Sequence, residues 1–194
     1  MTQSIDLKLI TGLGNPGNQY TRTRHNAGFW FVDALAQHYR GHFRAEKKFH
    51  GELAKLTVSG KDIWLLKPDT FMNRSGLAVQ AILKFYRLSP MQLLVAHDEI
   101  DLPPGTVRLK TSGGHGGHNG LRDIINQCGC RDFHRLRIGV GHPGSKDQVI
   151  DYVLHQPSKD DLISIQNNID DAINIMPELV SGDLQRAMHR LHSK

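Results

Sequence analysis

The sequence predicts a single α/β domain over residues 1–194, with a mixed β-sheet flanked by α-helices and closed by C-terminal helices. Short apolar segments typical of strands alternate along the chain with longer amphipathic segments typical of helices. A length of 194 residues, of which 39% are hydrophobic, suits one domain with a substantial core. No internal repeat or low-complexity linker divides the chain.

In the first half, each element follows from the spacing of its apolar residues. Asn26 is a good N-cap residue for a helix, and Ser59-Gly60 is a suitable turn between two strands. In chain order, the spacing predicts a buried strand at 7–11, a helix at 26–39, a hairpin formed by 49–58 and 61–66, a helix at 75–88 and a buried strand at 93–96.

In the second half, Pro103-Pro104-Gly105 turns the chain, and residues 135–140 alternate so that one face of a strand is basic. Pro177 should end or kink the helix in which it lies. The expected elements are strands at 107–110 and 135–140, and helices at 121–127, 158–180 and 183–191.

Charge is distributed unevenly along the chain. Residues 1–150 carry 20 Lys and Arg against 12 Asp and Glu, whereas residues 151–194 carry 4 against 7. A basic body with an acidic C-terminal region indicates a polyanionic partner for the body.

Membrane and secreted classes do not fit this sequence. No apolar run approaches the length of a membrane span, and the polar segment Met1–Asp6 does not resemble a signal peptide. Cys128 and Cys130 are one residue apart, which suits neither a disulfide framework nor a four-ligand zinc site. We therefore expect a reducing, cytoplasmic setting. We also expect a monomer, because no exposed apolar stripe in the sequence requires a partner.

The glycine-rich stretch Gly113–Gly120 is a candidate functional loop. It combines glycines with His115, His118 and Asn119, and it leads into a helix with Asn119 near the cap position. Polar side chains and a helix N-terminus can together receive a carbonyl or phosphate oxygen. A flexible surface loop with incidental histidines is the alternative interpretation.

A second glycine-rich stretch, Gly12–Gly17, matches the G-x-G-x-x-G pattern of dinucleotide-binding proteins after a strand. A true fingerprint needs a helix at the third glycine and an acidic residue after the next strand. Here Gly17 is followed by a polar, basic segment, and the strand at 63–66 ends in Lys67-Pro68. A nucleotide-binding enzyme is therefore an alternative that the context does not favour.

Polar residues that follow the predicted strands are candidates for one site, because sites in α/β sheets lie at strand ends. They include a histidine base, a carboxylate to orient it and amides to hold a polar substrate, a set suited to hydrolysis by an activated water. A metal site built from His115, His118 and Asp98 is conceivable, although amides stand where zinc would take His, Cys or carboxylate ligands. The full set is Asn15, His25, Asn73, Asp98 and Asn119, with His97, His115 and His118 alongside.

Several segments in register resemble the bacterial-type peptidyl-tRNA hydrolase family. Tyr20-x-x-Thr23-Arg24-His25-Asn26-x-Gly28-x-x-Phe31-Val32-Asp33 resembles its first signature, and Gly114-x-x-x-His118-Asn119-Gly120-Leu121-Arg122-Asp123-Ile124 resembles its second. The segments 12–17, 70–73 and 96–99 also resemble family segments in the expected order. The resemblance runs from about Leu7 to Gly144.

The resemblance implies hydrolysis of the ester between a peptide and the 3′ ribose of tRNA, without a metal or other cofactor. This reaction recycles tRNA and rescues translation. His25 would be the general base that activates water, and Asp98 would orient its imidazole. Asn15 would help distinguish a blocked N-terminus from a free one, and His118 would support the site. The groove for the substrate would be lined by Asn15, Tyr20, Phe71, Met72, Asn73 and Asn119.

The partner implied is tRNA carrying a peptide at its 3′ end. Phosphate contacts supply affinity without reading sequence, which suits an enzyme that accepts many tRNAs. The basic residues expected to contact tRNA are Arg108, Lys110, Arg135 and Arg137, with Arg131 and Lys146 as weaker candidates. No stable protein partner is implied. A non-catalytic RNA-binding module is the alternative class, and the presence of both His25 and Asp98 argues against it.

Overall fold

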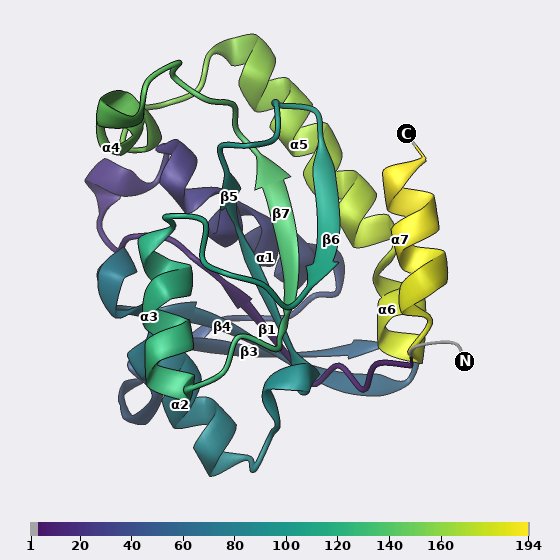
Figure 1. Cartoon of the computed structure of the whole chain (residues 1–194). Coiled ribbons are helices and arrows are strands. Elements are labelled where there is room, and N and C mark those ends of the chain that lie inside the picture. The colour runs from purple at the N-terminus through teal and green to yellow at the C-terminus, as the bar shows by residue number, and fades with distance from the viewer. Residues whose placement is uncertain (1–3, 194) are drawn as a thin grey trace.

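A seven-stranded mixed sheet forms the centre of the computed structural model, which describes residues 4–193 (Figure 1). The first three residues of the polar N-terminal segment, like Lys194, lie outside the described residues. The strand order is β2-β3-β4-β1-β5-β7-β6. The strands are β1 (Leu9–Gly12), β2 (Arg44–Glu46), β3 (Gly51–Val58), β4 (Lys61–Pro68), β5 (Leu93–Glu99), β6 (Val107–Thr111) and β7 (His134–Gly139).

The four central strands, β4, β1, β5 and β7, run parallel, whereas β2, β3 and β6 are antiparallel to their neighbours. The expected hairpin across Ser59-Gly60 is confirmed as β3 and β4, paired from Val58–Lys61 to Gly51–Pro68. The parallel core is apolar on both sides, as strands covered by helices on both faces must be.

Helices cover both faces of the sheet and give three layers (Figure 1). One face packs against α1, α5, α6 and α7, and the other against α2 and α3. No helix among residues 4–193 is both long and apolar enough to cross a membrane. The helices are α1 (Ala27–His38), α2 (Ser75–Phe85), α3 (Asn119–Cys128), α4 (Val149–Val153), α5 (Lys159–Asn174), α6 (Met176–Ser181) and α7 (Leu184–His192).

Three local expectations need correction. The N-cap of α3 is His118 and not Asn119, which is the first helical residue. The helix expected at 158–180 is two helices separated at Ile175; the expected break at Pro177 is confirmed, because proline fits in the first turn of a new helix. A strand at Arg44–Glu46 and a short helix at Val149–Val153 carry no clear periodicity and were not expected.

The carboxyl ends of β1 and β5 lie side by side at the centre of the sheet. The chain leaves β1 toward α1 on one face, whereas the chain after β5 reaches α3 on the other face through β6. Such a point in an α/β sheet leaves a crevice beyond the strand ends, where ligands bind. After Gly17 the chain forms a 3-10 turn at Asn18–Tyr20, so the helix that a dinucleotide fingerprint requires does not begin there.

Two glycines allow α1 to approach these strand ends closely. A Cβ on Gly28 would lie 2.3 Å from the Ala96 carbonyl oxygen and 2.5 Å from the Leu13 nitrogen. A Cβ on Gly12 would in turn lie 2.3 Å from the Gly28 carbonyl oxygen. The 3-10 turn Arg24–Asn26, which carries His25, precedes α1 directly and is thereby held against the end of β5.

We expect Gly28→Ala to lower the free energy of unfolding by about 1–3 kcal/mol, the usual cost of overpacking against atoms that cannot move aside. Chemical denaturation measures this change. Gly114→Ala is the matched control, because Gly114 is exposed and a Cβ there would meet nothing within 4 Å. Equal stability of the two variants would contradict the close packing described for Gly28.

Candidate active site

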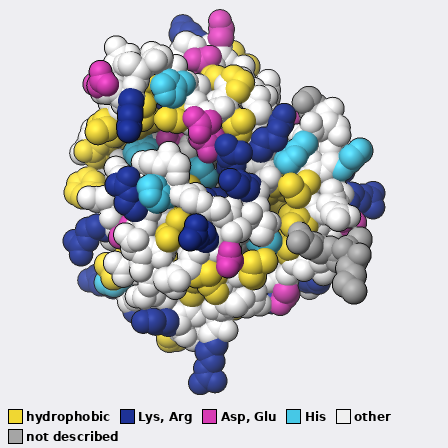
Figure 2. All heavy atoms as spheres, viewed as in Figure 1, with side chains coloured by type: hydrophobic (Ala, Val, Ile, Leu, Met, Phe, Trp, Pro, Cys, Tyr) yellow, Lys and Arg dark blue, Asp and Glu magenta, His cyan; other side chains and the backbone are white. Residues whose placement is uncertain are grey.

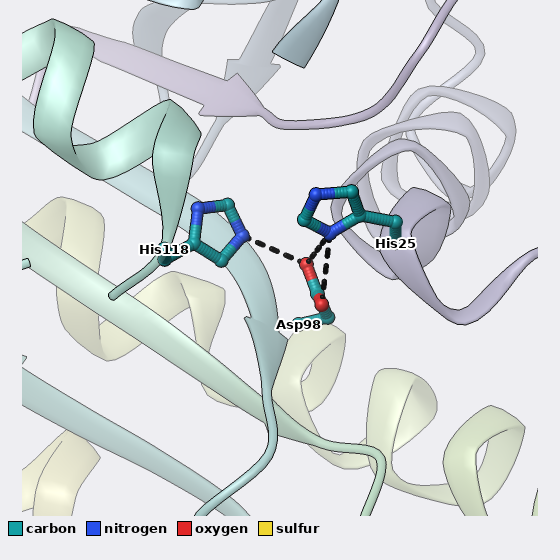
Figure 3. Close-up of side chains that lie close together, drawn as sticks. All are labelled: His25, Asp98 and His118. Carbon is teal, nitrogen blue, oxygen red and sulfur yellow. Dashed lines mark hydrogen bonds and ion pairs between the residues drawn. The ribbon is translucent and has the colours of Figure 1, made fainter. Parts of the chain in front are cut away.

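His25, Asp98 and His118 meet at the carboxyl end of β5 (Figure 3). The Nδ1 atom of His25 lies 3.0 Å from both carboxylate oxygens of Asp98. The Nε2 atom of His118 lies 2.8 Å from Asp98 Oδ1. One buried carboxylate thus holds two imidazoles, which come from the 3-10 turn before α1 and from the N-cap of α3.

The backbone around His118 determines where its proton lies. Its Nδ1 accepts hydrogen bonds from the amides of Gly120 (3.2 Å) and Leu121 (3.3 Å), which are free donors at the start of α3. The Nδ1 atom must therefore carry a lone pair, and in the neutral ring the proton resides on Nε2. His118 consequently donates to Asp98, so the N-cap orients the carboxylate.

Asp98 in turn makes His25 more basic. Burial lowers the pKa of His25, but the charge of Asp98 and its hydrogen bond raise it by more. The pKa of His25 therefore lies above its ordinary value of 6.5. Burial raises the pKa of Asp98, and the two imidazoles outweigh this effect and hold it far below 3.8. Asp98 is therefore ionised, and His25 keeps its Nδ1 proton while Nε2 points away from the carboxylate (Figure 3).

His97 packs next to His118 as a neutral imidazole. Its Nδ1 donates to the backbone carbonyl oxygen of Asp98 at 2.7 Å, and its ring centroid lies 5.0 Å from that of His118. Burial, reinforced by the neighbouring His118, lowers the pKa of His97 to about 4. His97 therefore stays neutral near pH 7 and acts as packing and as a backbone anchor.

Asn15 is held so that only its amide nitrogen is available. Its Oδ1 accepts a hydrogen bond from the Met72 amide at 2.7 Å. Its own backbone amide donates to Asn26 Oδ1, and its carbonyl accepts from Asn26 Nδ2. Asn26 was expected only as a helix cap; in the structure it fixes the loop after β1, a role that its spacing could not reveal.

The turn after β4 provides an apolar wall next to Asn15. Phe71 is 58% exposed, and its ring packs edge-on against Tyr20 at 6.3 Å between centroids. Met72 is buried against the start of α3, where a Cβ on Gly120 would lie 2.6 Å from its sulfur. Asn73 is exposed on the same 3-10 turn.

Asn119 is exposed at the first residue of α3 and follows His118 directly. Its Oδ1 accepts a hydrogen bond from Arg122 Nη1 at 3.0 Å, which leaves its amide nitrogen free to donate. The Gly113–Gly120 loop therefore presents His118 toward Asp98 and Asn119 toward solvent. His115 is separate from this cluster, since its Nδ1 accepts from the Gly117 amide.

The donor atoms of His25, Asp98 and His118 lie within 4.8 Å of one another, close enough to raise the question of a metal. Metal ligation requires a lone pair at the imidazole nitrogen that faces the ion. The proton on His118 Nε2 occupies that position while the α3 amides occupy Nδ1. The hydrogen-bond pattern thus fits a proton-transfer site better than a metal site, including the site conceived with His115.

Comparison with known proteins identifies one family. The sequence model of the peptidyl-tRNA hydrolase family matches residues 9–194. A peptidyl-tRNA hydrolase of Coxiella burnetii is 56% identical over 187 residues, covering 96% of this chain and 98% of the relative. One from Ruthia magnifica is 50% identical over 190 residues, covering 98% and 100%.

The chain belongs to the peptidyl-tRNA hydrolase family. The resemblance inferred from the sequence is confirmed, and so is the predicted fold class. A crystal structure of peptidyl-tRNA hydrolase from Acinetobacter baumannii superposes with a TM-score of 0.94 at 47% identity, covering 98% of this chain and 97% of that chain.

The basic residues expected to contact tRNA lie on β6 and β7 of this peptidyl-tRNA hydrolase fold. Arg108 pairs with Arg137, and Lys110 pairs with Arg135, so all four share one face of the sheet. Lys and Arg side chains gather over these two strands in Figure 2. Lys110 is exposed, and Arg108 and Arg137 are half-buried, with Arg137 Nε 3.0 Å from Glu99 Oε2.

Arg135 does not lie at the surface, as a phosphate contact would require. It is 2% exposed, and its guanidinium donates to the carbonyl oxygens of Gly113 and Gly114. The alternation of the strand predicted that the Arg135 side chain faces solvent, but its guanidinium is instead bound by glycine carbonyls at the start of the loop. Arg135 anchors the loop that carries His118.

Arg24 links the His25 turn to α4, a connection that the sequence did not indicate. Its Nη1 donates to the carbonyl oxygens of Tyr152 (3.0 Å) and His155 (3.3 Å), and its guanidinium lies 3.8 Å from the Tyr152 ring centroid. The Tyr152 hydroxyl donates to the Val140 carbonyl oxygen at the end of β7. Arg24 and Tyr152 thus connect the His25 turn and α4 to the residue that follows β7.

Proposed function

We propose that the hydrolysis of peptidyl-tRNA, which is the activity of this family, proceeds in this protein by direct attack of a water molecule on the ester bond, with His25 as the general base. The contact between His25 and the ionised Asp98 carries the proposal. It holds the Nδ1 proton in place, so Nε2 has the free lone pair that accepts a proton from water. The products are free tRNA and the released peptide.

The remaining polar groups suit substrate positioning. Asn15 and Asn119 each have a side-chain oxygen already engaged, which leaves an amide nitrogen to donate to a carbonyl oxygen. We propose that Asn15 contacts the amide of the blocked N-terminus and that Asn119 steadies the attacking water or the ester. Tyr20, Phe71, Met72 and Asn73 then line the groove for the peptide and the 3′ end.

Release of peptide from an N-blocked aminoacyl-tRNA, run beside the unblocked substrate and with a chelator, tests the reaction. We expect hydrolysis of the blocked substrate, far slower hydrolysis of the unblocked one, and no effect of the chelator. Equal hydrolysis of both substrates would refute the proposed role of Asn15. Loss of activity with the chelator would refute the metal-independent mechanism.

The pH dependence of kcat/KM reports on the free enzyme's base. His25 acts only when neutral, and its pKa is raised, so we expect activity to be lost as the pH falls through a value above 6.5. In Asp98→Asn, the charge that raises this pKa is absent, so the rising limb should move to lower pH. A limb at the same pH in both proteins would show that another group controls the rate.

Binding of the tRNA is assigned to the basic side chains of β6 and β7 that are exposed or half-buried. We propose Lys110, Arg108 and the Glu99-paired Arg137 as phosphate contacts, because solvent reaches all three, and exclude Arg135, which is buried with its guanidinium engaged by the loop. We also propose that the protein is a monomer and acts in the cytoplasm. A monomer would elute at the mass of one 21.8 kDa chain in size-exclusion chromatography with light scattering.

We expect Lys110→Ala to raise KM with little change in kcat. It should also reduce the slope of log KM against log salt by about 1, because one fewer phosphate is neutralised. Steady-state kinetics across a salt series measure both effects. Lys84→Ala, which removes an exposed charge on α2, is the control. An unchanged salt slope in Lys110→Ala would remove Lys110 from the tRNA face.

A further inference from the structure

A basic, aromatic-lined cavity lies at the edge of the sheet that is remote from the basic residues of β6. It has a volume of about 360 Å³, within the range of small-ligand pockets. It opens between β2, β3 and the C-terminal end of α2. None of the residues assigned to the active site lines it.

Strand register separates this cavity from the active site. Trp64, which lines the cavity, pairs with Leu9 at the start of β1, whereas the active site lies beyond the opposite end of β1 at Gly12. The sheet order places β2 at one edge and β6 at the other. Six strand spacings of about 4.8 Å separate them, so the two basic surfaces are distinct.

The rim of the cavity carries positive charge that is not neutralised within the protein. Arg40, Arg44 and Lys48 are exposed on the rim, and within residues 4–193 none of the three forms an ion pair. Lys55 also lines the cavity and is paired with Asp62. The acidic residue on the lining is Glu46. The rim therefore favours an anion.

Aromatic rings form the floor. Trp64 and Tyr86 stack at 5.3 Å between centroids with an interplanar angle of 25°, and Phe49 lies 6.0 Å from Tyr86. The Nζ of Lys48 lies 4.9 Å from the centroid of the Phe49 ring, so a cationic side chain contacts an aromatic ring at this cavity. Trp64 and Tyr86 are half-buried and line the cavity, where Lys55 Nζ lies 5.8 Å from the Trp64 ring centroid.

We propose that this cavity is a second RNA contact, which binds an unpaired nucleotide with its base against Trp64 and Tyr86 and its phosphate at Arg44 and Lys48. Cationic side chains next to aromatic rings are the combination that holds single-stranded nucleic acid, because phosphates meet charge and bases stack. An acidic peptide would use the cations and leave the rings unused. A lipid surface would require a convex apolar face, and this site is concave.

Trp64 provides a local reporter, since the chain has 2 Trp residues and Trp30→Phe removes the other. The probe is a short 5′-phosphorylated oligoadenylate, titrated into the Trp30→Phe protein while Trp64 emission is followed. We expect a saturable change in emission. Adding Arg44→Glu and Lys48→Glu should raise Kd at least about tenfold, and salt should weaken binding.

Lys84→Glu with Arg87→Glu is the matched control, because it reverses two exposed charges near the same end of α2 but outside the cavity. Its Kd should stay within about twofold of the parent, a difference under about 0.5 kcal/mol. No saturable change, or equal Kd values in the two double variants, would overturn the proposal. Inorganic phosphate that competes as well as the oligonucleotide would also overturn it, because the base would then contribute nothing.

Deacylated tRNA is a further probe. A Trp64 response to tRNA that the Arg44 and Lys48 changes abolish would assign the site to the substrate's own RNA, and a response to the oligoadenylate alone would assign it to another RNA. Hydrolysis of N-blocked aminoacyl-tRNA by the same variants should keep the parent kcat. The fluorescence readout does not depend on turnover, so failure of this proposal and failure of the proposed hydrolysis are distinguishable.

Discussion

Replacing His25 with alanine is expected to lower kcat by a factor of about 10²–10⁴, the usual contribution of a positioned general base. The physical reason is that Nε2 of His25 is the lone pair that the Asp98 contact prepares for proton transfer. Binding of tRNA should change little, because the proposed phosphate contacts lie on β6 and β7. Single-turnover hydrolysis of N-blocked aminoacyl-tRNA measures the chemical step directly.

His38→Ala is the matched control, because His38 is an exposed imidazole at the other end of α1. It should hydrolyse the substrate at the parent rate. Near-normal turnover by His25→Ala, with thermal unfolding unchanged, would show that His25 is not the base.

Asp98→Asn is expected to lower kcat by a similar factor, on the order of 10²–10⁴, through the wrong tautomer of His25. Both His25 and His118 donate to the carboxylate, and His118 cannot reverse its ring because α3 amides occupy its Nδ1. An amide offers one oxygen and one NH₂ group. The NH₂ group would face His25 and favour a proton on Nε2, where the lone pair is needed.

Substrate affinity should be largely retained in Asp98→Asn, so KM and equilibrium binding of an uncleaved analogue separate the two roles. Asp101→Asn, an exposed carboxylate in the following turn, is the control and should behave as the parent does. Lost binding with a normal kcat in Asp98→Asn would reassign Asp98 to substrate recognition.

Much of the fold was predictable because it depends on local periodicity. The hairpin of β3 and β4, the helix after Asn26 and the buried strand β5, which carries Asp98 near its end, all have apolar spacing that allows one interpretation. His25 and Asp98 were found as candidates because each follows a strand or begins a helix near a strand end, where the fold collects polar groups.

The details that were missed depend on tertiary contacts. Arg135 alternates with its neighbours as a surface residue would, but two glycine carbonyls face it in the folded chain and bury its charge. His118 replaces Asn119 as the cap of α3 because the backbone at His118 is extended, with φ −74° and ψ 115°, and its ring reaches the free amides. The link from Arg24 to α4 spans 128 residues and has no local signal.

A titration of His25 followed by NMR, compared with the pH profile of kcat/KM for the same enzyme, tests the central claim most directly. We predict that the pKa of the His25 imidazole in the free protein equals the kinetic pKa, that both lie above 6.5, and that both fall in Asp98→Asn. A kinetic pKa that differs from the measured pKa of His25, or that stays fixed when the His25 titration moves, would contradict the assignment of His25 as the base.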